Sequence, residues 1–266
     1  MQRALDFIRL FNDVDDYLRR MVSADREYSF FRVVDHASEV NRAVYAHRDQ
    51  LKGYARLRNA IVHYRNYPPE VVAEPSEEAL LEFARAVEDV KAPSPLLAIA
   101  SKEVQVFSPT SGLVAALAYM MENDFSPIVV GLDDSLRLLT TEGIARWLER
   151  RAEEGVVNVE AAILPDVLEH EKLPNVVFAD RTQSVYDGRA LFSQGLARAR
   201  ERIFAVIITE SGSDSEVPLG VVTPWDMMEL APELGQGPAD RQRHPASVAA
   251  TLTPGRQPVR DTAIGR

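Results

Sequence analysis

The segment around residue 60 carries side chains whose types and spacing could do acid–base chemistry. Arg58, Asn59 and His63 lie within a stretch of six residues. A histidine can move a proton near neutral pH, and an arginine can stabilise the charge that develops on a phosphate. If the segment is helical, Asn59 and His63 share a face, so the amide can orient the imidazole. The sequence therefore offers a candidate acid–base site here.

The same segment has a plainer interpretation. Arg58 and His63 are five residues apart, which separates them by about 140° on one straight helix. Both reach one atom only if the helix begins or bends near Gly53, or if a symmetric dimer brings two copies together. Arg58 also falls in a seam of apolar positions at 37, 40, 44, 51, 54, 58 and 61, where a charge needs an explanation. The alternative is a half-buried or solvated Arg–His pair without a catalytic role.

A second string with chemical content is GVVTPWD, which runs from Gly220 to Asp226. Thr223 is a good helix cap, Pro224 suits the first helical position, and the carboxylate of Asp226 gains about 0.3–1 kcal/mol from the helix dipole. The same side chains could hold a nucleotide, because a threonine hydroxyl can donate to a phosphate and a carboxylate can accept both hydroxyls of a ribose. Helix capping and nucleotide binding both account for the string.

Residues 1–91 must position the first of these sites, and their pattern predicts helix almost throughout. Apolar residues recur at helical spacing from Leu5 to Phe11, from Val33 to Val44 and within Glu77 to Val90. Short loops between such helices favour an antiparallel bundle. The fold predicted for this part of the chain is therefore an all-helical domain.

Beyond Pro95 the pattern changes to short apolar runs that alternate with helical stretches, which indicates an α/β fold. The order β-α-β-β-α occurs twice: VFSPTSGL at Val106 parallels VFADRTQS at Val177, and RLLTTEG at Arg137 parallels GVVTPWD at Gly220. Such a repeat predicts two copies of one small unit packed face to face. The predicted divisions are a linker over 92–103, a first unit over 104–153, a connector over 154–174, a second unit over 175–231 and a disordered tail over 232–266.

Composition excludes several classes of protein. The chain has 266 residues, no cysteine and a formal net charge of -10, which excludes disulfides and a cysteine nucleophile and favours a reducing, cytoplasmic setting. No apolar stretch is long enough for a membrane span, and the histidines lack metal-ligand spacing, so neither a membrane nor a metal is expected. The acidic balance argues against coating of nucleic acid, although the window 41–66 has six basic residues against one acidic residue and could face a polyanion.

The duplicated region, about residues 100–231, resembles the tandem cystathionine-beta-synthase-type (CBS) domains that form a Bateman module. In that family a G-x-x-T-x-x-D string closes each nucleotide site, and Gly220, Thr223 and Asp226 match the string in full. The resemblance implies a regulatory ligand that is an adenine nucleotide (AMP, ADP or ATP) or a related adenosyl compound. The second copy is expected to hold an intact site.

The first copy departs from this motif. Thr140 matches the threonine, but Arg137 stands in place of the glycine and Gly143 in place of the aspartate. The resemblance therefore implies a degenerate or differently specific site in this copy. Thr140 is expected to act as a helix cap rather than as a ligand contact.

The R-N-x-x-x-H string of Arg58, Asn59 and His63 resembles the R-x(4–6)-H motif of HEPN domains, which are helical bundles common in prokaryotic defence and toxin systems. Many HEPN domains are metal-independent endoribonucleases whose active site forms at a dimer interface. The resemblance implies that His63 handles the 2′-hydroxyl proton or the leaving oxygen, that Arg58 stabilises the scissile phosphate and that Asn59 keeps the site in order. Arg56 and Arg65 would position RNA by its backbone, and catalysis would need no cofactor.

Together the resemblances give one functional hypothesis and leave a second open. The first is a cytoplasmic homodimer that senses an adenine nucleotide, in which a Bateman module regulates a HEPN endoribonuclease through the linker over 92–103. The alternative is a non-catalytic nucleotide-binding sensor whose helical domain only dimerises or docks a partner. RNA cleavage that depends on His63 would separate the two.

Overall fold

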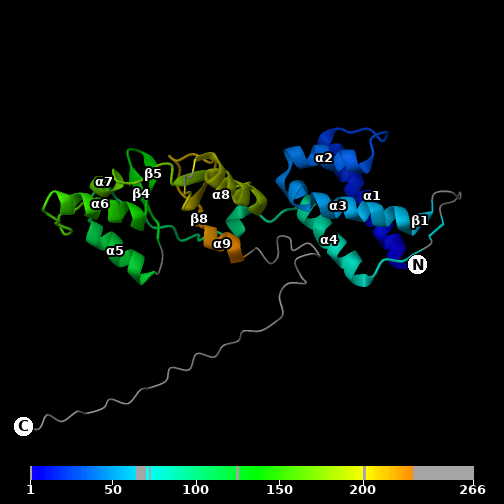
Figure 1. Cartoon of the computed structure of the whole chain (residues 1–266), viewed down its shortest axis with the longest axis horizontal. Helices are drawn as coiled ribbons and strands as arrows, with labels where there is room; N and C mark the ends of the chain where they lie inside the picture. The colour runs from blue at the N-terminus through cyan, green and yellow to red at the C-terminus, as the bar shows by residue number, and fades with distance from the viewer. Residues whose placement is uncertain (1, 64–69, 72, 124–125, 200–201, 230–266) are drawn as a thin grey trace, which may run out of the picture. The chain divides into compact units, whose positions relative to one another are not determined.

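The computed structural model describes residues 2–63, 70–71, 73–123, 126–199 and 202–229 (Figure 1). Within these ranges no helix combines the length and the apolar character that a bilayer crossing requires. The tail predicted to be disordered, over 232–266, lies outside the described residues and stays a prediction.

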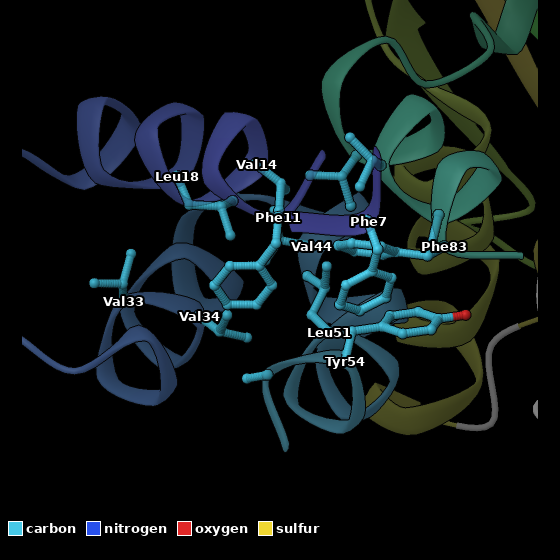
Figure 2. Close-up of a cluster of buried hydrophobic side chains, with 14 of the residues drawn as sticks. Phe7, Phe11, Val14, Leu18, Val33, Val34, Val44, Leu51, Tyr54 and Phe83 are labelled. Atoms are coloured by element: carbon cyan, nitrogen blue, oxygen red, sulfur yellow. The ribbon is translucent and has the colours of Figure 1, made fainter. Parts of the chain in front are cut away.

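The first part of the chain folds into helices around one hydrophobic core. These helices are α1 (Gln2–Val22), α2 (Phe30–Val40), α3 (Arg42–Ile61) and α4 (Glu77–Lys91). Each contributes apolar side chains to the core, as Figure 2 shows. The ring of Phe83 is fully buried, with its centroid 4.3 Å from that of Tyr54 and 4.9 Å from that of Phe7. The helical fold predicted from the apolar spacing is thus present in the described part of residues 1–91.

Asn41 interrupts the apolar pattern that was expected to continue from Val33 to Val44. α2 ends at Val40, and the Asn41 side chain accepts a hydrogen bond from the backbone N–H of Val44 at 3.0 Å, which caps the start of α3. Val40 is 71% exposed, whereas Ala37 and Val44 are fully buried. The place predicted for Val40 in the apolar seam is therefore wrong, because the helix restart breaks the 3.6-residue register of the stripe.

The second part contains two small sheets of the same topology. The first sheet holds β3 (Val106–Phe107), β4 (Ile128–Leu132) and β5 (Ser135–Leu139), and the second holds β6 (Val176–Asp180), β7 (Ala205–Thr209) and β8 (Gly220–Val222). In each sheet the central strand is parallel to the first strand and antiparallel to the third. The predicted duplication is confirmed by this repeated topology.

Helices accompany both sheets. Those in the predicted order are α5 (Leu113–Glu122) and α6 (Thr141–Glu153) in the first copy, and α8 (Val185–Ala199) and α9 (Pro224–Glu229) in the second. The 3-10 helix η1 (Leu96–Ala98) and the short helix α7 (Leu164–Leu168) lie in the segments predicted as linker and connector. α5 begins as many residues after Val106 as α8 begins after Phe178. Phe178, rather than the predicted Val177, therefore corresponds to Val106.

The predicted connector over 154–174 is a structural part of the first copy. Its helix α7 contributes Leu164, fully buried, to the core of this copy. The backbone N–H of Leu164 donates to the carbonyl of Ser111, and that of Leu113 donates to the carbonyl of Ala162. These bonds fix α7 against the start of α5.

The predicted linker over 92–103 completes the second copy in the same way. Leu96 of η1 is fully buried in the core of this copy, and its backbone N–H donates to the carbonyl of Gln183. Ser101 forms an isolated antiparallel bridge with Val221 of β8. Neither segment is therefore a free connection. The sequence pattern did not predict this packing, because the residues that order each segment lie elsewhere in the chain and leave no periodic signal within the segment.

Candidate functional site

The junction of β8 and α9 carries the G-x-x-T-x-x-D string. Thr223 follows the last residue of β8 and donates to Oδ2 of Asp226 from its backbone N–H at 2.6 Å and from Oγ1 at 2.8 Å. A side chain three positions into a helix that accepts from the N-cap N–H is half of a capping box. The position of the Asp226 carboxylate is therefore fixed by the protein itself.

Thr223 and Asp226 line a crevice of about 160 Å³. Pro127, the first two residues of β4 and Tyr119 of α5 also line it, so both copies contribute to its wall. Among the described lining residues the charged side chains are those of Glu103 and Asp226, and none is a lysine or an arginine. This lining suits a ligand that offers hydroxyl groups and carries little negative charge.

Gly220, predicted to contact a nucleotide, serves the packing behind the crevice. It is buried at the start of β8 and is not among the residues that line the crevice. A Cβ on Gly220 would lie 2.7 Å from the Cβ of Ala100, so the bare backbone lets the segment before Ser101 lie against the strand. At the matching position of the first copy Arg137 is exposed and meets no such limit.

In the first copy Thr140 caps α6, as expected. Its Oγ1 accepts from the backbone N–H of Gly143 at 3.0 Å, and the residue is 1% exposed. The carboxylate of Glu171 in turn accepts from the Thr140 N–H at 2.6 Å and from its Oγ1 at 2.9 Å. Burial raises the pKa of Glu171, although hydrogen bonds from Thr140 and Asn175 act in the opposite direction. Sequence reasoning missed Glu171 because no motif links two residues 31 positions apart.

The predicted helical face shared by Asn59 and His63 is wrong. α3 ends at Ile61, and Val62–His63 forms the short strand β1, which pairs antiparallel with β2 (Glu70–Val71). Consecutive β-branched residues at this point favour extended backbone over a further helical turn. The side chains of His63 and Arg65 lie outside the described structure, so their predicted roles stay predictions.

Arg58 is turned towards the interior of the bundle. Its guanidinium carbon lies 5.9 Å from the ring centroid of Phe11 on α1, and Nη1 lies 3.5 Å from Oδ1 of Asn59. Burial lowers the pKa of Arg58, and the charge of Asp15 partly offsets this effect. Arg56 is exposed. The structure thus brings Arg58 and Asn59 together and accounts for the charge in the apolar seam by its contact with α1.

Comparison with known proteins gives matches of structure only. No protein-family model matches the chain, and no curated protein matches it. Solved structures similar to about half of the chain are CBS-domain proteins. CBSX2 in complex with AMP shares 13% identity over 53% of this chain and 98% of its own, with a TM-score of 0.39. A conserved CBS-domain protein from Thermoplasma acidophilum (17% identity, 52% and 68% covered, TM-score 0.38) and the hexameric CBS-CP12 protein from bloom-forming cyanobacteria (17%, 52% and 72%, 0.38) are also similar.

Proposed function

We propose that residues 92–229 form a Bateman-type sensor that binds an adenine nucleotide or a related adenosyl ligand at Thr223 and Asp226. The observation that carries this proposal is the Asp226 carboxylate, which Thr223 holds in place at the wall of a crevice lined by both copies. A carboxylate so placed can accept both hydroxyls of a ribose, and the ring of Tyr119 offers an apolar surface in the same crevice.

The charge of the residues that line the crevice limits which adenosyl ligands fit. Glu103 and Asp226 would repel a polyphosphate, and the described lining residues provide no cation to offset them. AMP or a neutral or cationic adenosyl compound should therefore bind at this crevice more tightly than ATP.

The position of the crevice suggests how occupancy would reach the helical part. Ser101 and residues 103–105 line it, and the chain between them and α4, which ends at Lys91, consists of η1 and its short flanks. A ligand that contacts the two copies and this segment would favour one arrangement of these three parts over another. The ligand can shift the balance between the two arrangements only by the difference in its affinity for them.

Isothermal titration of the full chain with AMP, ADP, ATP and S-adenosylmethionine tests the proposal. Asp226→Asn keeps an acceptor for the Thr223 N–H but removes the charge, so we expect affinity for the preferred ligand to fall about tenfold, which corresponds to about 1.4 kcal/mol. Asp166→Asn, at an exposed position of α7, is the matched control and should leave affinity unchanged. Absence of binding by every adenosyl ligand would overturn the proposal.

For the helical part we propose a non-catalytic role as a dimerising or docking domain, with endoribonuclease activity as the second candidate. The packing of Arg58 over Phe11 favours the first role, and the contact between Arg58 and Asn59 is the observation that favours the second. RNA cleavage by the wild type and by His63→Ala, with and without AMP, decides between them. Cleavage lost in His63→Ala establishes the ribonuclease, and a dimer that cleaves in neither form establishes the docking role.

A further inference from the structure

The first copy has a crevice of its own, and its chemistry differs from that of the crevice at Asp226. It has a volume of about 240 Å³ and lies at the start of α6, as the other lies at the start of α9. Phe204, just before β7, lines it, as residues at the start of β4 line the other crevice. The two crevices therefore occupy corresponding places in the two copies.

Glu171 provides in this crevice the carboxylate that the motif lacks. Its Oε1 accepts from the N–H and Oγ1 of Thr140 at 2.6 and 2.9 Å, and Oδ2 of Asp226 accepts from the same two groups of Thr223 at 2.6 and 2.8 Å. Asn175 Nδ2 donates to the second oxygen, Oε2, at 3.0 Å. The carboxylate is thus fixed at the helix start in both copies, although it comes from a different part of the chain in each.

The charge of the lining is opposite in character to that of the other crevice. Arg146, Lys172 and Arg202 line it together with the carboxylates of Glu142 and Glu171. Glu142 bridges the two arginines, with Arg146 Nη2 at 3.0 Å and a close contact to Arg202. With three cations and two carboxylates, this lining offers positively charged hydrogen-bond donors to a phosphate. The charged residues of the other crevice, Glu103 and Asp226, offer none.

We infer that the first crevice binds a ribonucleoside polyphosphate, with Glu171 as the carboxylate that accepts the ribose hydroxyls and with Arg146, Lys172 and Arg202 as phosphate contacts. This inference rests on the proposed nucleotide-sensing function and assigns the two crevices to ligands of different charge. A polyphosphate would compete with Glu142 for Arg146 and Arg202, and the ion pairs with Glu142 already hold both arginines at the crevice. The chain would then respond to two ligands, one highly anionic and one not.

The experiment titrates the full chain with ATP and, separately, with adenosine. Lys172→Ala combined with Arg202→Ala should lower ATP affinity about tenfold or more, because two exposed charge-assisted contacts are lost. The same variant should leave adenosine binding at the Asp226 crevice unchanged. Asp226→Asn should show the reverse pattern, and raised salt should weaken ATP more than adenosine.

A pair of variants tests Glu171 itself. Glu171→Ala should lose ATP affinity about tenfold, and adding Gly143→Asp should restore it, because the new carboxylate at position 143 enters the space that Glu171 vacated. Thermal melting of each variant confirms that it is folded. ATP affinity that changes only with Asp226→Asn would overturn this inference and leave the proposed function standing. Failure of both adenosine and ATP to bind would overturn both.

Discussion

The Glu171 carboxylate occupies the space that a side chain at Gly143 would need. A Cβ on Gly143 would lie 2.0 Å from Oε1 and 2.4 Å from Cδ of Glu171. Both residues meet at Thr140, whose Oγ1 accepts from the Gly143 N–H and donates to Glu171. Gly143, which stands in place of the motif aspartate, therefore leaves the space in which the Glu171 carboxylate lies.

Gly143→Ala should lower the free energy of unfolding by about 1–3 kcal/mol, because the methyl group would displace the Glu171 carboxylate from its hydrogen bonds with Thr140. In a Glu171→Ala background the same substitution should cost much less. Urea denaturation of the wild type, the two single variants and the double variant measures the coupling between the positions. Additive free energies would show that the two side chains do not compete for space.

The stability contributed by Glu171 should fall as pH rises. Burial raises its folded-state pKa above the ordinary value of 4.5, so between the two values the folded protein holds a proton that the unfolded chain has released. Relative to Glu171→Ala, the wild type should therefore lose stability as pH increases from 4.5 through the raised pKa, and the difference should then level off. Urea denaturation over this range and up to neutral pH measures the profile, and a difference that grows with pH would contradict it.

Phe83→Ala should destabilise the helical part by about 3–5 kcal/mol, since it leaves a cavity among closely packed aromatic rings (Figure 2). Leu81→Ala on the same helix is the control, because Leu81 is 52% exposed and its loss should change stability by only about 0.5 kcal/mol. Denaturation followed by circular dichroism compares the two. Equal effects would mean that Phe83 is not the centre of this core.

Gly220→Ala should cost about 1–3 kcal/mol, because its Cβ would lie 2.7 Å from the Cβ of Ala100, an atom that cannot rotate away. Gly53→Ala provides the opposite control. This glycine is inside α3, and a methyl group there would meet no neighbouring side chain within 4 Å, so alanine should stabilise the helix by about 0.5–1 kcal/mol. Thermal melting gives the sign of each change, and a neutral Gly220→Ala would show that Ala100 does not press on β8.

Arg58→Met should leave stability within about 1 kcal/mol of the wild type. Burial disfavours the charged guanidinium and so lowers the pKa of Arg58, and methionine keeps an apolar chain over Phe11. Chemical denaturation checks this, with Arg56→Met at an exposed position as the comparison. A loss of more than about 2 kcal/mol would show that the Arg58 charge itself holds the bundle together.

Features that depend on neighbouring residues could be predicted from the sequence. The helix over Glu77 to Val90 is present as α4, and Ser76 caps it by accepting from the Ala79 N–H at 3.1 Å. Caps and helical stripes are set by residues within about four positions, so a single chain carries their full signal.

Tertiary structure alone decided the features that join distant residues. It placed Glu171 against Thr140 across 31 positions and brought Ser101 to Val221. Within the sequence these residues have no pattern that marks the contact, since a carboxylate or a serine at one position fits many surroundings. The repeated β-α-β-β-α unit and its threonines, Thr140 and Thr223, could therefore be recognised from the sequence, because local patterns specify them. Which residue supplies the carboxylate beside Thr140, and which charges line each crevice, depended on which segments pack together in the fold.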